Sequence, residues 1–323
     1  MKNLLNYCAI EWYEDDLVKN GFTLDEYLRK YDFAGIEQFF YNTYIPMSRY
    51  QHDTVGGHLA YWAYWLDLWE NNVDNMRSQF ISEQEKCSYF GGAKNKDEWL
   101  SVIRENINIA LSQKPEYLVW HVAECNLADI YTFSFRHSDE EIVKAAAEVF
   151  NCVADIIPDN VLVLFENLWW PGLRLLDKNV VHKFFSLIKK ANVGIMLDTG
   201  HLLNTNDQLE NEQQAIEYIL MRLDALGMEA ERIKGIHLNY SLSGEYQRSF
   251  KHHIPENIDE KILTEHVVAI DQHRPFTQNG VRRILEKIKP EYLVHELNYK
   301  DFSQLDELLA AQLAACGLFN IEA

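Results

Sequence analysis

Six acidic or imidazole side chains each stand at the end of a short apolar segment. The segments are GGH ending at His58, YLVWH at His121, VLVLFE at Glu166, GIMLD at Asp198, IKGIH at His237 and YLVHE at Glu296. Such groups are costly to bury unless a partner compensates them. If the segments are parallel strands of a closed barrel, all six ends meet at its C-terminal mouth, where barrel enzymes place their chemistry. Carboxylates and imidazoles that converge there predict a metal site.

Eight apolar segments of strand length recur along the chain, and amphipathic segments of helix length separate most of them. The predicted strands are residues 4–10, 34–40, 55–60, 116–122, 161–166, 193–198, 233–238 and 291–297. Thr23 with Glu26, and Ser138 with Glu141, have the spacing of a helix capping box. Strands that alternate with helices indicate repeated βα units and a parallel sheet. We therefore predict an α/β fold, a (β/α)₈ TIM barrel.

Two stretches are longer than a simple βα connection, residues 61–100 and 240–280. Insertions after the third and seventh strands would lie over the mouth as lids or substrate loops. Trp62, Trp65 and Trp69 in the first stretch predict an exposed aromatic surface, which would suit a homodimer. No internal repeat or linker is evident, so residues 1–323 are predicted to form a single barrel domain with these insertions.

The composition and net charge limit which classes of protein this chain can belong to. A chain of 323 residues with 47% hydrophobic residues can bury a large core. Its net charge of −19 makes nucleic acid an unfavourable partner. No run of 18 apolar residues occurs, so no membrane span is expected. The five cysteines are scattered without a CxxC pair, which is typical of reduced thiols in a cytoplasmic protein.

Alternation along the strands predicts which side chains point into the barrel. If Glu166 points inward, Leu164 and Leu162 do so too, and apolar side chains lie below each polar end. His295 has the opposite parity to Glu296 and should face the helix layer as a structural residue. Glu37 points inward only if Gly35 does, so its place in the site stays open.

The segments FENLWWPG, LDTGHLLN, GIHLNYS, DQHRPF and VHELNY together resemble the xylose isomerase-like TIM-barrel superfamily. This superfamily includes sugar phosphate isomerases and epimerases, and phosphodiesterases of the endonuclease IV type. The resemblance extends from the first strand to the last. Each motif alone is weak, but their order and their placement at strand ends make the set specific at the level of the fold.

In the isomerase and epimerase branch, the resemblance implies one divalent ion held by Glu166, Asp198, His237 and Glu296. Three carboxylates and an imidazole suit Mn²⁺, Mg²⁺ or Co²⁺. The ion would act as a Lewis acid for an enediolate. Glu166 and Glu296 would be the catalytic residues that transfer the proton, and His201 would bind a substrate oxygen.

In the endonuclease IV branch, the resemblance implies two or three Zn²⁺ ions and a larger ligand set. The additional ligands would be His58, His121, His201, Asp271 and His273. Such a cluster would activate water and stabilise a phosphoryl displacement. The long spacing between His237 and Asp271 departs from that branch, and GGHLAYW around His58 departs from its usual segment, which puts the third metal in doubt.

Other residues are candidates for substrate contact. His121 would bind substrate if it is not a ligand, and Trp169 would form an apolar wall. Arg274, with Arg248 and Lys251, is a candidate anion clamp. The histidines outside the strand ends and the DxxH and DxH motifs are predicted to be surface or loop residues.

The leading prediction is a metal-dependent isomerase or epimerase of a small polyhydroxy carbonyl compound, favoured by the acidic surface. One alternative is a phosphoester hydrolase of a small molecule, favoured by the number of ligands. The other is a metal-stabilised binding protein.

Overall fold

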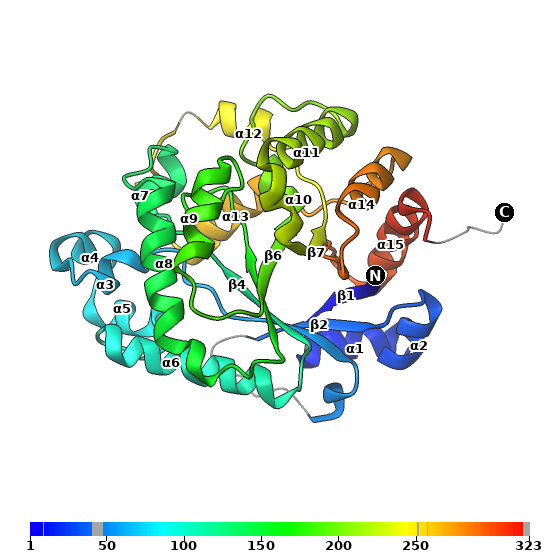
Figure 1. Cartoon of the computed structure of the whole chain (residues 1–323), viewed down its shortest axis with the longest axis horizontal. Coiled ribbons are helices and arrows are strands. Elements are labelled where there is room, and N and C mark those ends of the chain that lie inside the picture. The colour runs from blue at the N-terminus through cyan, green and yellow to red at the C-terminus, as the bar shows by residue number, and fades with distance from the viewer. Residues whose placement is uncertain (9, 41–47, 251, 257, 319–323) are drawn as a thin grey trace.

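The computed structural model describes residues 1–8, 10–40, 48–250, 252–256 and 258–318. Eight parallel strands form a closed barrel in chain order, with each strand paired to the next and β8 paired to β1. The strands are β1 Lys2–Tyr7, β2 Gly35–Phe39, β3 Thr54–His58, β4 Tyr117–His121, β5 Leu162–Glu166, β6 Val193–Asp198, β7 Ile233–Leu238 and β8 Tyr292–His295. The helices surround these strands (Figure 1). The predicted (β/α)₈ barrel is therefore confirmed.

The helices complete the ring and its connections. They are α1 Glu11–Lys19, α2 Leu24–Lys30, α3 Leu66–Trp69, α4 Val73–Gln79, α5 Glu83–Tyr89, α6 Lys96–Ser112, α7 Leu127–Thr132, α8 Asp139–Val153, α9 Lys178–Leu187, α10 Thr199–Leu203, α11 Glu212–Leu226, α12 Gly244–Ser249, α13 Glu260–Ile270, α14 Arg282–Ile288 and α15 Phe302–Cys316. Short 3₁₀ helices are η1 Ser48–Gln51, η2 Ala154–Ile156, η3 Gly227–Arg232 and η4 Asn279–Val281. Both predicted capping boxes are present, at the starts of α2 and α8.

The barrel interior follows the predicted alternation. A cluster of apolar side chains fills it, made of Leu4, Val55, Tyr117, Val119, Leu164, Met196, Tyr292 and Val294. Most of these residues lie two positions, or a multiple of two, before a polar strand end. His295 faces the helix layer as predicted, because its Nδ1 accepts from the Gln312 amide of α15 and its Nε2 donates to Asn3. Burial lowers the pKa of His295 to about 3, so this ring is neutral.

The register of the strands brings the polar ends together. His121 of β4 lies beside Glu166 of β5, and Asp198 of β6 lies beside His237 of β7. Glu296 follows the last residue of β8 directly. The ionisable side chains at the strand ends therefore lie at one level of the barrel mouth.

Both insertions are helical and contribute residues to the same end of the barrel. The first carries α3, α4 and α5, and the second carries α12 and α13 (Figure 1). The expectation of an exposed aromatic surface in the first insertion is wrong for Trp62 and Trp65, which are buried in the core. Their indole N–H groups are also paired, to the carbonyls of Tyr89 and Ala123. These two side chains therefore give no support to a dimer.

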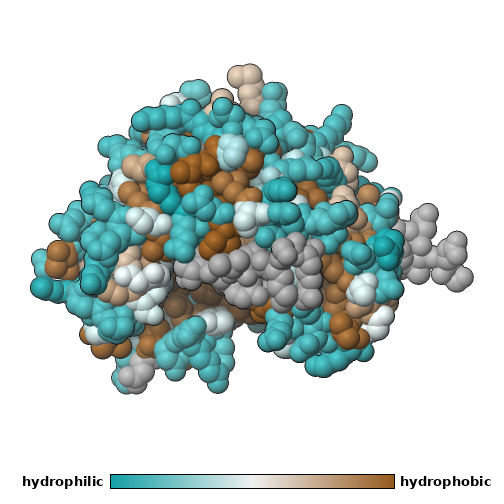
Figure 2. Space-filling view, turned by 90° about the horizontal axis from the view of Figure 1, so that it is seen from below, coloured by the Kyte–Doolittle hydropathy of each residue, from teal (hydrophilic) through white to brown (hydrophobic). Residues whose placement is uncertain are grey.

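The molecular surface is mainly hydrophilic on the face that Figure 2 shows. Figure 2 shows a face that is largely hydrophilic, with smaller hydrophobic patches between the polar side chains. Within the described residues, no helix is long and apolar enough to cross a membrane. One predicted surface histidine is in fact internal: His266 of α13 is buried, where its ring bonds to the Tyr246 hydroxyl and the Ile130 carbonyl.

Candidate metal centre

Glu166 stands at the centre of the barrel mouth. Its carboxylate lies 3.5 Å from Nε2 of His58 and 3.3 Å from Nε2 of His121. It also lies 3.2 Å from Nδ1 of His201 and 3.3 Å from Nδ1 of His237. Four imidazoles from separate elements are thus directed at one fully buried carboxylate.

These converging atoms are not satisfied by hydrogen bonds. Both oxygens of Glu166, Nε2 of His58, Nδ1 of His237 and Oε2 of Glu296 are buried and make no hydrogen bond within the described residues. Buried polar atoms without partners are rare in folded proteins because each one loses its hydration. All of them belong to types that bind divalent metals. The residues present therefore fit a metal centre.

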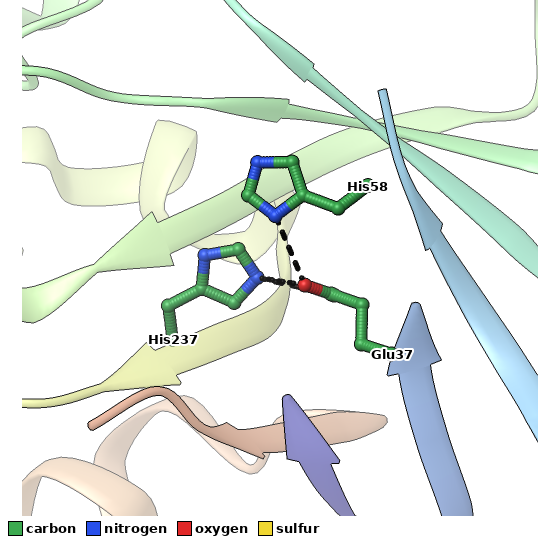
Figure 3. A group of neighbouring side chains, drawn as sticks. All are labelled: Glu37, His58 and His237. Atoms are coloured by element: carbon green, nitrogen blue, oxygen red, sulfur yellow. Dashed lines mark hydrogen bonds and ion pairs between the residues drawn. The ribbon is translucent and has the colours of Figure 1, made fainter. Parts of the chain in front are cut away.

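Glu37 of β2 holds two of the histidines from the opposite side (Figure 3). Its carboxylate lies 3.2 Å from Nδ1 of His58 and 2.9 Å from Nε2 of His237. The Tyr117 hydroxyl donates to the same carboxylate at 2.8 Å. A Cβ at Gly56 would overlap the Tyr117 ring, so the glycine leaves room for this contact. Because Glu37 occupies one nitrogen of each ring, the other nitrogen of each ring is presented to Glu166.

Asp198 and His201 are positioned by the start of α10. Asp198 caps this helix by accepting from the backbone N–H of His201 at 2.6 Å, and its second oxygen accepts from Asn239 at 2.8 Å. Nδ1 of His201 lies 2.9 Å from the Asn167 carbonyl, which can only accept. Nδ1 therefore carries the proton, and Nε2 faces the second insertion. The Asp-x-x-His spacing works here because it occupies one helical turn.

Asp271 and His273 bring the second insertion into the site. Oδ2 of Asp271 lies 3.2 Å from Nε2 of His201 and 2.8 Å from Nε2 of His273. His273 has a left-handed backbone, with φ of 46°. Strained backbones of this kind cluster at functional sites. Reciprocal backbone hydrogen bonds between Arg274 and Tyr240 anchor the following residue.

The donors form overlapping groups whose ligand atoms lie within 4.8 Å of one another. The groups are Glu166–Asp198–His237–Glu296, His58–His121–Glu166, Asp198–His201–His273 and Glu37–His58–His237. Glu166, Asp198, His58 and His237 each belong to two groups. The groups therefore form one continuous cluster of residues that could hold more than one ion. All nine metal ligands considered from the sequence are brought to one place, since Asp271 contacts two of the grouped histidines.

The charges of the site are strongly coupled. Burial alone would raise the pKa of Glu37, but the imidazoles of His237 and His58 hold it at about 2. Burial raises the pKa of Asp198 to about 6. Burial lowers the pKa of His273, but the Asp271 carboxylate outweighs this effect and raises it to about 9. Carboxylates raise the pKa of His237 well above its usual value in the same way. These pKa shifts favour the protonated forms of His237 and His273 beside the carboxylates.

The other predicted substrate residues lie in different places. Trp169 lines the pocket above the centre, with its ring 5.3 Å from that of His201. Arg274 does not line this pocket, and its guanidinium stacks on Tyr240. Arg248 is exposed and donates to the Asp207 carbonyl, and Lys251 lies outside the described residues. Sequence reasoning left Glu37 open and did not single out Asn167, Asn239 or Tyr117.

The fold and site define a TIM barrel with a cluster of carboxylate and imidazole residues at its mouth that could hold metal. Residues 119–314 match the family model described as the xylose isomerase-like TIM barrel, and the chain belongs to this family. No curated protein matches the sequence.

Solved structures share the fold at low identity. Endonuclease IV from Thermus thermophilus is 12% identical with a TM-score of 0.52, and the match covers 98% of each chain. A D-tagatose 3-epimerase-like protein is 15% identical with a TM-score of 0.51 and 98% coverage of each chain. A D-psicose 3-epimerase is 12% identical with a TM-score of 0.51, over 98% of this chain and 97% of that chain.

Proposed function

We propose that this protein hydrolyses a phosphoester bond in a small molecule, using two or three divalent metal ions. The observation that carries the proposal is the excess of ligands over what a single ion takes. Four carboxylates (Glu166, Asp198, Asp271, Glu296) and five imidazoles (His58, His121, His201, His237, His273) meet at the mouth, and Glu37 lies behind two of the imidazoles. With neutral imidazoles these four carboxylates and Glu37 carry a charge of −5, one from each. One divalent cation leaves most of that charge uncompensated, whereas two or three bring the net charge to within one unit of zero.

The groups of neighbouring ligands indicate how the ions would be held. His58 and His121 would hold one ion with Glu166, and His201 and His273 would hold another with Asp198. His237 and Glu296 complete the group around Glu166 and Asp198. When bound, the ions would lower the pKa of a water nucleophile and stabilise the charge on the phosphoryl oxygens. Zn²⁺ suits the share of imidazole ligands.

A small molecule is a better substrate than nucleic acid for this chain. The net charge of −19 opposes the approach of a polyanion. None of the described residues that line the pocket above the centre is a lysine or an arginine. The phosphate contacts on which nucleic-acid binding depends are therefore missing from the described walls.

A second candidate is isomerisation or epimerisation of a small polyhydroxy carbonyl compound with one Mn²⁺, Mg²⁺ or Co²⁺. The group Glu166–Asp198–His237–Glu296 supports it, because it is the four-residue set that this chemistry needs. Glu166 and Glu296 would then move the substrate proton. This candidate leaves His58, His121 and the Asp271–His273 pair without a part in metal binding, which is why we place it second.

Metal analysis and two assays separate the candidates. The gently purified protein should contain two or three zinc ions per chain and hydrolyse bis(4-nitrophenyl) phosphate. Glu166→Gln should lower that hydrolysis by at least about a thousandfold, since it removes the shared ligand. Glu105→Gln, at an exposed position of α6, is the matched control and should keep the wild-type rate. A content of one ion per chain, together with exchange of solvent deuterium into a ketose, would contradict the hydrolase proposal and support the isomerase candidate.

A further inference from the structure

The pocket above the metal centre has apolar walls. It has a volume of about 520 Å³, which is in the range of sites for small ligands. Its apolar lining includes Phe39, Tyr61, Tyr64, Trp169, Leu263 and Val267. Tyr61 and Tyr64 belong to the first insertion, and Leu263 and Val267 belong to α13 of the second. Both insertions therefore shape the approach to the centre, as their length predicts.

Aromatic rings lie directly against the ligand histidines. The Phe39 ring is 4.9 Å from that of His58, the Tyr61 ring is 4.7 Å from that of His121, and the Trp169 ring is 5.3 Å from that of His201. A substrate group bound at the metal centre would therefore lie in contact with these rings. The indole Nε1 of Trp169 is buried and has no hydrogen-bond partner within the described residues.

Cations near the mouth are engaged elsewhere. Arg136 pairs with Asp129 and donates to Asn126, and Arg274 stacks on Tyr240. Neither lines the described walls of the pocket. A second anionic group on the substrate would therefore find no partner in these walls, whereas an apolar group would be removed from water there.

We propose that the substrate is a phosphodiester whose non-leaving group is apolar and preferably aromatic. This inference rests on the proposed hydrolase function. The metal centre would take the phosphoryl group, and the rings and the α13 side chains would take the apolar group. The insertions would then determine specificity, while the strand ends carry the reaction.

Two esters with one leaving group test this selectivity. Methyl 4-nitrophenyl phosphate and phenyl 4-nitrophenyl phosphate release the same phenolate, so a difference reports on the retained group. We expect kcat/KM to be about tenfold or more higher for the phenyl ester, mainly through KM, because a phenyl ring buries more apolar surface than a methyl group. Equal values for the two esters would overturn the inference.

Substitutions in the α13 wall of the pocket test whether these side chains cause the preference for the phenyl ester. Leu263→Thr with Val267→Thr keeps the branched shape at Val267 and should lower the phenyl-to-methyl ratio of kcat/KM several-fold. Val18→Thr is the matched control, because Val18 is 68% exposed on α1 and does not line this pocket. An unchanged ratio in the double variant would contradict the assignment of these walls.

Binding without turnover separates this inference from the proposed function. Calorimetry on the metal-loaded protein would compare phenylphosphonate with methylphosphonate, which share one anionic head. Phenylphosphonate should bind about tenfold more tightly or better. If neither ester is hydrolysed but this preference holds, the hydrolase proposal fails and the apolar specificity stands. If the two phosphonates bind equally, the specificity fails whatever the esters do.

Discussion

At the scale of single residues, Glu37 shows how a buried carboxylate sets the geometry of a site without facing its centre. It accepts from one nitrogen each of His58 and His237 and from the Tyr117 hydroxyl. We expect Glu37→Gln to weaken metal binding about 10- to 100-fold, because an amide cannot accept from both rings with the same strength. Competition with a chelator would measure the affinity, and Glu105→Gln would serve as the control. Unchanged affinity would show that Glu37 does not position these ligands.

A second residue gives a prediction that does not involve metal. Glu124 is buried after β4, and burial, with Asp67 and Asp129 nearby, raises its pKa to about 8. The folded state thus keeps a proton that the unfolded chain loses near its ordinary pKa. Stability from this proton is present at low pH and is lost as the pH rises toward 8. Glu124→Gln should therefore gain stability relative to the wild type, by about 2 kcal/mol as the pH rises from about 6 to about 8.

Urea unfolding at several pH values would measure this difference. The exposed Glu105→Gln should show the same pH dependence as the wild type. A stability difference between Glu124→Gln and the wild type that stays constant over this range would mean that Glu124 is already ionised in the folded protein at the lower pH.

At the scale of elements, the strands can be predicted because each is a short apolar run, most of them with a polar end. Every predicted strand is present, and the largest difference is at β1, which ends at Tyr7 where the apolar run predicts residue 10. The capping boxes of α2 and α8 depend only on residues three positions apart, so the sequence is sufficient for them. The short helices α3, α4 and α5 are four to seven residues long, too short for a helical period to be recognised.

The part of the site that could not be predicted depends on long-range contacts. Glu37 lies inside its strand instead of at the end, and its partners are 21 and 200 residues away in the chain. Nothing local indicates that the neighbouring strand β3 and the distant strand β7 both present imidazoles to it. The predictions for Trp62 and His266 are wrong for a related reason, since each is buried by contacts of the insertions that the sequence does not specify.

At the scale of the whole molecule, the barrel holds its ionisable groups where water cannot compensate them. Carboxylates raise the pKa of both His201 and His237 well above its usual value although burial opposes this, which favours protonated rings when no metal is bound. Metal binding must displace those protons, so affinity should increase as the pH rises. The stability of the fold and the occupancy of the site are therefore linked.

This linkage gives a measurable result. Zn²⁺ or Mn²⁺ at about 100 times its Kd should stabilise the metal-free protein by about 2.7 kcal/mol per independent ion, seen as a rise in Tm. At one fixed metal concentration the rise should be larger at alkaline than at mildly acidic pH, because the pKa of His273 is about 9 and protons compete with the ion at lower pH. Glu166→Gln should show little rise, since Glu166 contacts four of the imidazoles. An equal rise in this variant would mean that the ions bind elsewhere on the acidic surface.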